Sequence, residues 1–252
     1  MNVRRPTAAD AAAVTELIQA FDVATTGESE VAEADVLRDW APIDLDRDAW
    51  LLELDGALAG YCELTDRADE LLVSGYVHPG FFARGVGTRI AELTEANAAA
   101  RGAPVLRNAV LADDKAAHAL LEGHGYRPVR HFYRMVIELT EPPPAPEWPA
   151  GVEVSTFDYR AEARAFHAAL EETFAEEWDH KPETFEEWHE RRIVRMPFDP
   201  SLWFVVRAGG EIAAVVACDW KRVRQGLHRR NRGAEAVAPP RPRARSPPPR
   251  VR

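Results

Sequence analysis

The chain has 252 residues, enough for two modest domains, and its 46% hydrophobic content is ordinary for a folded protein. No apolar run reaches the roughly 18 residues of a membrane-spanning helix, and the N-terminal MNVRRPTAADAAAV lacks the apolar core of a signal peptide. Cys62 and Cys218, both in apolar strand-like runs, are typical of free thiols in a reducing cytosol. We therefore expect a cytoplasmic protein with no membrane partner.

The net charge of −10 is divided unevenly along the chain. Residues 221–252 carry Lys221 and ten arginines against the single acid Glu235, so residues 1–220 hold the whole acidic excess. An acidic surface repels nucleic acid and steers cationic ligands towards the protein, although it serves solubility equally well. We expect any nucleic-acid partner to bind only the basic tail.

Strand and helix patterns alternate through the first half of the chain. Thr7 and Asp10 nearly form a capping box at the start of the first helix, and Asp55-Gly56 is a strong hairpin signal between two apolar runs. This order predicts an α/β fold in which helices flank a sheet. The expected strands cover residues 2–6, 49–54, 57–64, 71–77, 105–110 and 133–139, and the expected helices cover residues 7–21, 30–40, 88–102 and 114–122.

Residues 77–87, which read VHPGFFARGVG, join an apolar strand to a helix. A glycine-bearing turn in this place directs backbone N–H groups and a helix N-terminus at an anion. The glycines let the backbone approach a phosphate closely, and Arg84 adds a positive charge. Neither the dinucleotide-binding pattern G-x-G-x-x-G nor a Walker loop is present. The turn predicts a site for a diphosphate-bearing ligand, unless its glycines serve backbone geometry alone.

The second half of the chain begins the pattern again. Residues 141–150, EPPPAPEWPA, hold five prolines and predict an extended linker. A strand at 152–154 and helices at 160–174 and 184–195 follow the linker. Residues 199–220 then repeat the hairpin pattern of residues 46–64, with two apolar runs about a glycine turn. A tandem duplication explains this repetition.

The second repeat stops where its own glycine turn is due. Residues 221–252 contain ten arginines and six prolines, cannot bury a core, and predict a disordered tail. Such a tail suits acidic partners, but GC-rich DNA translated in a shifted frame gives the same composition, and we favour this interpretation. We therefore divide the chain into a domain at 1–139, a linker at 140–150, a truncated repeat at 151–220 and the tail.

Three motifs together resemble the GCN5-related N-acetyltransferase (GNAT) family over residues 2–139. Positions 82–87, FARGVG, resemble the family loop Arg/Gln-x-x-Gly-x-Gly/Ala, with Phe82 at its first position. Val77-His78-Pro79 resembles the V-x-P that ends the family's fourth strand, and residues 114–126, DKAAHALLEGHGY, resemble N-x-x-A-x-x-L-Y-E-x-x-G-F. The resemblance implies a GNAT fold with a mixed sheet, complete in the first domain and truncated in the second, in the tandem arrangement of mycothiol synthase-like members.

The resemblance also implies acetyl-CoA as the co-substrate, and we expect no metal. The backbone of Val77 would pair with the pantetheine arm. The loop would hold the pyrophosphate mostly through its backbone, so Phe82 in place of Arg or Gln removes one charge but not the site. The residues of this cradle are Phe82, Ala83, Arg84, Gly85, Val86, Gly87 and Thr88.

Acetyl transfer to an amine needs a base more than an acid. An alkylammonium with a pKa near 10.4 costs about 4–5 kcal/mol to neutralise at pH 7, whereas protonating a thiol with a pKa near 8.5 matters by about 2 kcal/mol. Family members often carry an acidic base on the third or fourth strand, which makes Glu63 our preferred base. Tyr76 is a candidate to face the acetyl group, with a buried strand aromatic as the alternative interpretation. His78 is the alternative base near neutral pH, or else a loop residue hydrogen-bonded to the backbone.

The acid position of the family motif is altered in this chain. Leu121 stands where the family often has a tyrosine that protonates the leaving thiolate. Tyr126 is our candidate substitute, and Tyr133 and His118 also lie near in sequence order. Each of these side chains is equally compatible with a core or surface role.

We expect an acetyl-CoA-dependent N-acetyltransferase in which a primary amine of a small molecule or peptide attacks the thioester directly. The sequence does not identify the acceptor. Leu121, Phe82 and the incomplete repeat also fit a second hypothesis, a catalytically degenerate CoA-binding or scaffold protein. A homodimer is one way to cover the strand edges of the partial repeat, and a third hypothesis is a binder of acidic partners through the arginine tail.

Overall fold

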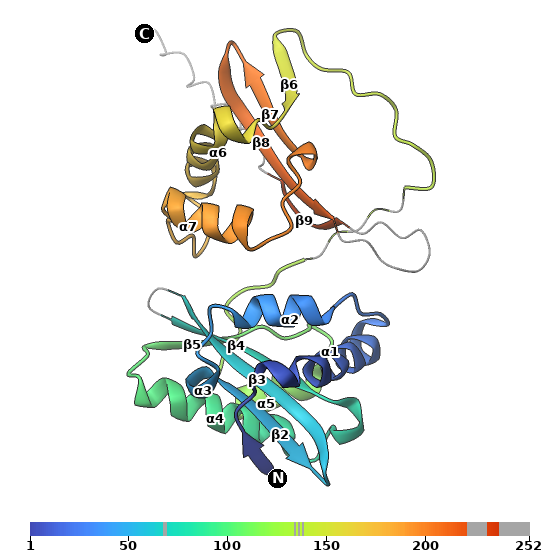
Figure 1. The fold of residues 1–252 in the computed structure, drawn as a ribbon, viewed down its shortest axis with the longest axis vertical. Helices are drawn as coiled ribbons and strands as arrows, with labels where there is room; N and C mark the ends of the chain where they lie inside the picture. The colour runs from blue at the N-terminus through green and yellow to red at the C-terminus, as the bar shows by residue number, and fades with distance from the viewer. Residues whose placement is uncertain (68–69, 134, 136, 138, 221–230, 237–252) are drawn as a thin grey trace, which may run out of the picture. The chain divides into compact units, whose positions relative to one another are not determined.

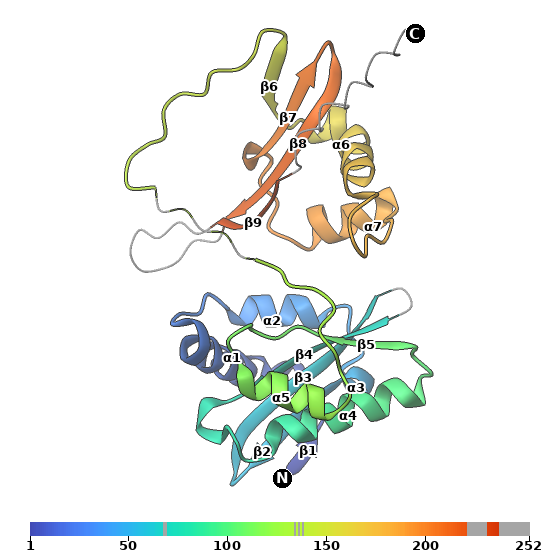
Figure 2. The ribbon, with the colours of Figure 1, turned by 180° about the vertical axis from the view of Figure 1, so that it is seen from behind.

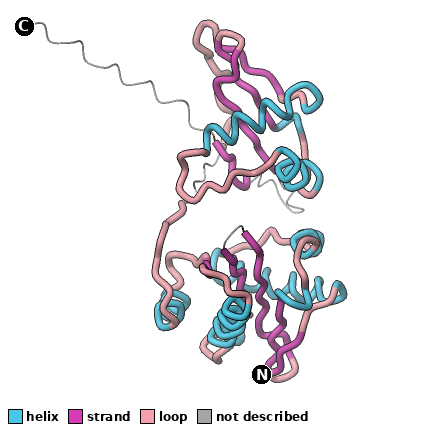
Figure 3. The backbone as a smooth tube through the Cα atoms, turned by 90° about the vertical axis from the view of Figure 1, so that its left-hand side faces the viewer, coloured by secondary structure: helices cyan, strands magenta, loops and turns pink. Residues whose placement is uncertain are grey.

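The computed structural model describes residues 1–67, 70–133, 135, 137, 139–220 and 231–236. The chain divides into two units, Met1–His131 and Phe132–Arg252, and each unit has a sheet with helices packed beside it (Figures 1 and 3). None of the helices in these described ranges is both long enough and apolar enough to cross a membrane.

The first unit is built on a five-stranded sheet in the order β1-β2-β3-β4-β5. Strands β1 to β4 pair antiparallel, and β5 joins β4 in parallel, which confirms the predicted α/β fold with a mixed sheet. The strands are β1 (Asn2–Arg4), β2 (Ala49–Leu54), β3 (Ala57–Arg67), β4 (Glu70–Val77) and β5 (Val105–Asn108). The helices are α1 (Ala11–Thr26), α2 (Glu33–Trp40), α3 (Leu45–Asp48), α4 (Val86–Ala100) and α5 (Lys115–Gly123).

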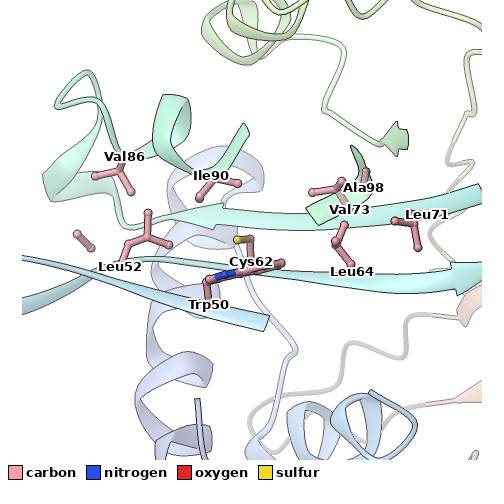
Figure 4. Packing of buried hydrophobic residues seen from close by; sticks show 10 residues of the cluster. Trp50, Leu52, Cys62, Leu64, Leu71, Val73, Val86, Ile90 and Ala98 are labelled. Carbon is pink, nitrogen blue, oxygen red and sulfur yellow. The ribbon is translucent and has the colours of Figure 1, made fainter. Parts of the chain in front are cut away.

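Successive side chains of β3 point to opposite faces of this sheet. Tyr61 packs with α1 and α2 on one face, whereas Cys62 and Leu64 pack with α4 on the other. Figures 1 and 2 show the two helical layers from opposite sides, and Figure 4 shows Val86 and Ile90 of α4 beside the strand residues. Burial on both faces fixes the register of β3, because a shift by one residue would exchange the faces.

Strands β4 and β5 pair only where both begin. Their pairing runs from Glu70 with Val105 to Val73 with Asn108, so β4 continues to Val77 without a partner from β5. Along its other edge, β4 pairs with β3 over its whole length. The backbone of residues 74–77 therefore has one edge inside the sheet and one edge where the two strands diverge.

The second unit has a four-stranded antiparallel sheet in the order β6-β7-β8-β9. Its core is aromatic: the ring of Trp203, which is fully buried, stacks with those of Phe157 and Phe166. The elements are β6 (Val152–Thr156), α6 (Tyr159–Phe174), α7 (Phe185–His189), β7 (Trp203–Ala208), β8 (Glu211–Trp220) and β9 (Asn231–Ala236).

The β7–β8 hairpin has the same pairing geometry as the β2–β3 hairpin. The pairing register shifts between Leu52 and Glu53 in the first hairpin, and between Val206 and Arg207 in the second. A short helical segment precedes each hairpin, α3 in the first unit and a 3-10 turn at Pro200–Leu202 in the second. The two hairpins thus agree in shape with the repeated sequence pattern, while the duplication itself stays a prediction.

The described residues of the strand predicted at 133–139 form no strand. Tyr133, Met135, Ile137 and Leu139 are 88%, 90%, 78% and 66% exposed. Alternating apolar residues form a strand only where a neighbour satisfies their backbone hydrogen bonds. No described strand pairs with these four residues, so the periodic pattern alone was insufficient.

Other boundaries also differ from the sequence predictions. The helix predicted at 184–195 is divided into α7 and a π-helical turn at Glu190–Val194, and the helix predicted from residue 30 begins at Glu33. Strand β9 lies within the tail for which the sequence predicts disorder. The rest of that tail, residues 221–230 and 237–252, lies outside the described residues.

Candidate active site

A cavity of about 700 Å³ lies in the first unit where β4 and β5 diverge. Its walls come from residues 73–77 of β4, residues 108–111 at the end of β5 and after it, the end of α1, the β4–α4 loop, the first turns of α4 and the start of α5. Asp22 and Asp114 are the charged residues among its described walls. Asp114 accepts a hydrogen bond from the N–H of Ala117, so its carboxylate caps α5. A volume of this size suits a small-molecule ligand.

The backbone amides at the start of α4 are available to such a ligand. Gly85 is the residue before the helix, and the first bond of the helix runs from the N–H of Arg89 to the carbonyl of Gly85, at 3.1 Å. Within the described chain, the amides of residues 85–88 therefore donate to no backbone carbonyl, as expected for a helix N-terminus. These groups and the helix dipole together favour an anion at this end of the cavity.

Two glycines keep this helix start open. Gly85 has a φ of +81°, which only glycine adopts without strain. A Cβ on Gly87 would come within 3.1 Å of the Leu120 side chain on α5. Ala83, two residues before Gly85, also has a positive φ, of 59°. Gly85 adopts this left-handed backbone without strain, Ala83 adopts it at a cost because of its Cβ, and Gly87 leaves room for a close approach.

Arg84 does not present an uncommitted charge to the cavity. Its guanidinium lies 2.6 Å from the carboxylate of Asp55, which is in the β2–β3 turn. Both side chains are about half exposed, so the ion pair stabilises little and can exchange for another anion. Phe82 turns towards α1 instead, where its ring lies 6.5 Å from that of Phe21, edge to face. Backbone groups, more than side chains, define the anion site.

Val77 lies at the end of β4 and lines the cavity. Its backbone pairs with Gly60 of β3 on one side, and β5 leaves the other side unpaired, as described above. An extended ligand with amide groups is able to add along this edge. Val73 and Ser74 line the same wall further down the strand.

Glu63 lies on β3, one strand away from this wall, where it pairs in register with Ser74. The hydroxyl of Tyr61 donates a hydrogen bond to Oε2 of Glu63. Burial raises the pKa of the Glu63 carboxyl to about 7, while the hydrogen bond from Tyr61 opposes that rise. A carboxylate with a pKa near neutrality is suited to accept a proton at physiological pH.

Tyr76 lies beside Tyr61 in the neighbouring strand and lines the cavity. The two rings are stacked, with centroids 6.4 Å apart and an interplanar angle of 9°. Phe21 of α1 contacts Tyr76 edge to face at 5.5 Å. The predicted residues Glu63 and Tyr76 therefore lie on the same face of neighbouring strands, and Ser74, which pairs in register with Glu63, lines the cavity together with Tyr76.

His78 and Tyr126 are placed differently. The Nδ1 atom of His78 accepts a hydrogen bond from the N–H of Gly80, which fixes the ring in the turn after β4. Burial raises the pKa of Tyr126 to about 12, and the side chain of Asn108 acts on its hydroxyl in the opposite direction. Neither residue belongs to the described cavity wall, whereas Leu121 does.

The sequence analysis missed Trp40, which completes this group. Its indole Nε1–H donates a hydrogen bond to the hydroxyl of Tyr61, at 2.6 Å. Trp40 ends α2, more than twenty positions before Tyr61, so no local motif connects the two. The alternation of Tyr61 and Glu63 on β3 was the available signal, because it places both side chains on one face.

The acetyltransferase (GNAT) family profile matches residues 13–126 of this chain. A crystal structure of a GCN5-related N-acetyltransferase from Sphaerobacter thermophilus is 36% identical, with a TM-score of 0.74, over 88% of this chain and 72% of that one. The chain belongs to the GCN5-related N-acetyltransferase family. Membership of the GNAT family confirms the resemblance found in the loop and its flanking motifs.

Curated relatives of this GNAT chain carry the name mycothiol acetyltransferase. The one from Thermobispora bispora is 34% identical over 177 residues, which cover 69% of this chain and 56% of the relative. The one from Acidothermus cellulolyticus is 29% identical over 176 residues, which cover 69% and 51%. The chain spans about half the length of these curated relatives.

Proposed function

We propose that the first unit transfers the acetyl group of acetyl-CoA to a primary amine of a small molecule or peptide. The observation that carries this proposal is the set of backbone amides at residues 85–88, which have no carbonyl partner and stand at one end of the cavity. Family membership supports acetyl transfer as the reaction, and the acceptor is the open part of the proposal.

The cradle fits a pyrophosphate by its chemistry. Residues 85–88 offer backbone donors, whereas the amides of Phe82 and Arg84 already donate to the carbonyls of Pro79 and Phe81. Gly85 and Gly87 keep side chains out of the approach. Val77 would pair with the amide groups of the pantetheine arm along the edge that β5 leaves unpaired. Bound acetyl-CoA would supply the acetyl group as a thioester, from which the CoA thiolate leaves when an amine attacks the carbonyl carbon.

Glu63 is the proposed base. Neutralising an alkylammonium at pH 7 costs about 4–5 kcal/mol, so a nearby carboxylate that accepts the proton lowers the barrier substantially. With a pKa of about 7, Glu63 is basic enough to compete for this proton and is still partly ionised at neutral pH. Glu63 does not line the described cavity, whereas its register partner Ser74 does, so a water molecule is a suitable carrier for the proton.

The proton donor for the leaving thiolate matters less to this proposal than the base does. The family tyrosine position holds Leu121, which lines the cavity and has no proton to give. Tyr126 is the proposed substitute, although it lies outside the described wall. Protonating the thiolate matters by about 2 kcal/mol at neutral pH, so solvent is an adequate proton source.

The remaining assignments are proposed on similar grounds. The shared hairpin geometry supports a tandem arrangement in which 1–139 is the catalytic domain, 140–150 a linker and 151–220 a partial repeat. The composition supports a cytoplasmic location as a proposal. A homodimer is one way to cover the strand edges of the second sheet. The curated relatives' name places the acceptor of the mycothiol acetyltransferases first among the amines to be tried.

Thermal-shift measurements with acetyl-CoA and CoA test the cofactor. A panel of amines that includes the acceptor of mycothiol acetyltransferases, followed by detection of free thiol, then tests transfer. We expect a rise in melting temperature with either nucleotide, and turnover that Glu63→Gln reduces about 100-fold or more. A melting temperature unchanged by both nucleotides would contradict the proposal.

A catalytically degenerate CoA-binding or scaffold protein is the second candidate function. Leu121 at the family's acid position and Phe82 at the first loop position favour it. A rise in melting temperature with CoA, without turnover across the whole amine panel, would support this alternative over the first.

A further inference from the structure

We propose that Tyr61 is a positioning residue for Glu63, and that Trp40 holds Tyr61 in turn. A directed chain of hydrogen bonds then runs from the end of α2 across the sheet face to the proposed base. The inference depends on the proposed function only because that function gives Glu63 a chemical role. The hydrogen-bond chain itself is inferred from the contacts between the side chains of Trp40, Tyr61 and Glu63.

The direction of this chain follows from its first member. An indole N–H is a donor only, and that of Trp40 donates to the oxygen of Tyr61, at 2.6 Å. The same N–H also acts on the Glu63 carboxyl, where its effect on the pKa is smaller than that of the Tyr61 hydroxyl. A phenol oxygen that accepts this bond keeps one O–H to donate, and its remaining neighbour is Oε2 of Glu63. The hydroxyl hydrogen is thereby aimed at the carboxylate. The ionised form of Glu63 accepts it best, so the chain selects the form that a base needs.

Burial makes these two bonds strong and rigid. Trp40 is 5% exposed and Tyr61 is 2% exposed, so water does not compete for either bond. The Tyr61 ring is held between Trp40, with centroids 6.0 Å apart, and Tyr76, with centroids 6.4 Å apart. A ring held on both sides keeps its hydroxyl in place while Glu63 changes protonation state.

Few other charges act on Glu63. Asp39, next to Trp40 on α2, is the neighbouring carboxylate whose charge opposes ionisation. The neighbouring strands offer Ala49 of β2 and Ser74 of β4 at the pairing positions. Helix α1 contributes Thr15 and apolar residues to this face, and the Thr15 hydroxyl is used by a backbone carbonyl of its own helix.

The pKa of Glu63 is therefore a balance with identifiable parts. Burial and the charge of Asp39 raise it, while the hydrogen bonds from Tyr61 and Trp40 lower it. Burial also raises the pKa of the Tyr61 hydroxyl, so Tyr61 stays a donor throughout the physiological range. Removing the Tyr61 hydroxyl should leave burial unopposed and move the titration of Glu63 upwards.

The test is the titration of Glu63 in the full chain, followed by carbon NMR of ¹³C-labelled glutamate carboxyls, with Glu63→Gln used to assign the signal. We expect Tyr61→Phe to raise the midpoint by about one pH unit, since a hydrogen bond to a charged group is worth about that much. Tyr159→Phe, which removes the hydroxyl of a tyrosine in the second unit, is the matched control and should leave the midpoint unchanged.

A midpoint that stays in place in Tyr61→Phe would overturn the inference, even if Glu63→Gln abolishes acetyl transfer. A raised midpoint in a protein whose Glu63→Gln variant still transfers acetyl groups would instead support the chain and reject Glu63 as the base. If Tyr61→Phe does not fold, Trp40→Phe keeps the Tyr61 hydroxyl but removes its donor. Trp40→Phe should then raise the midpoint in the same direction by a smaller amount, and no change would overturn the inference.

Discussion

At the scale of single residues, Glu63 shows how one carboxyl obtains an unusual proton affinity. Glu63 follows Cys62 on β3, and the Cys62 side chain is buried on the opposite face of the sheet. The Glu63 carboxyl therefore lies partly buried between the sheet and the helices of the other face. Burial raises its pKa from the ordinary 4.5 to about 7. Such a shift has a consequence for stability as well as for catalysis.

The raised pKa of Glu63 makes stability change with pH in the opposite direction to the lowered pKa of a salt-bridged acid. Between pH 4.5 and 7 the folded protein holds the Glu63 proton more tightly than the unfolded chain does, so stability falls as pH rises through this window. The ionised carboxylate costs the folded state about 3 kcal/mol above pH 7. We expect Glu63→Gln to be stabilised relative to wild type at pH 8 and not at pH 4.

Denaturant unfolding of both proteins at the two pH values measures this difference. The comparison is made between proteins at one pH, so titration of other carboxyls cancels. An equal stability difference at pH 4 and pH 8 would show that Glu63 titrates at its ordinary pKa.

At the scale of elements, the junction of β4 with α4 decides what this sheet is able to bind. β5 pairs with the first half of β4 only, and α4 begins with four amides that have no backbone acceptor. A strand edge and a helix N-terminus therefore meet at one cavity. The helix supplies donors for an anion, and the strand supplies donors and acceptors for an extended chain.

Glutamate substitutions in the loop test this junction. Gly85→Glu imposes left-handed strain and a negative charge at the helix start, and Gly87→Glu adds the same charge together with a contact to Leu120. We expect both to abolish acetyl-CoA binding in calorimetry, a loss of at least about 100-fold in affinity. Unchanged affinity in both variants would disprove the anion site.

Gly102→Glu is a matched control for these substitutions. Gly102 follows the other end of α4, has a positive φ of +65°, and a Cβ added there would have no neighbour within 4 Å. The substitution therefore imposes the same kind of strain and the same charge away from the cavity. We expect it to lower stability and to leave acetyl-CoA affinity unchanged.

At the scale of the whole molecule, the two units share a hairpin but not a site. In the second hairpin Ala217 of β8 pairs with Trp203 of β7, and in the first hairpin Glu63 of β3 pairs with Ala49 of β2. Ala217 therefore takes the position that Glu63 has in the first unit. Val215 likewise stands where β3 has Tyr61, and it is fully buried. The second unit therefore repeats the strand geometry with an apolar core in place of the carboxyl and phenol.

Truncating the chain after the first unit tests what the second unit contributes to acetyl-CoA binding and to solubility. The described cavity wall lies within residues 21–121, so a chain that ends at Leu139 should bind acetyl-CoA with the affinity of the full chain. It should also be more soluble, because the partial repeat that we propose at residues 151–220 would expose strand edges that favour association. Calorimetry and a solubility measurement check these outcomes, and lower solubility of the shorter chain would contradict the partial-repeat interpretation.

The sequence was sufficient for the features that depend on neighbours along the chain. The hairpin turn at Asp55-Gly56, the glycine loop before α4 and the helix predicted at 114–122 each follow from local residue types, and the structure has all three. The family motifs and the order of strands and helices in the first unit are features of the same kind. Their physical cause lies within a few residues, where a sequence pattern is most informative.

Only the tertiary structure decided how distant residues combine. It joined Trp40 to Tyr61 across two elements, paired Arg84 with Asp55, and gave Tyr133, Met135, Ile137 and Leu139 no partner among the described strands. It also kept Tyr126 out of the described cavity wall, although sequence order placed it near the family motif. These outcomes depend on which strands pair and how far, and such long-range contacts have no periodic trace in the chain.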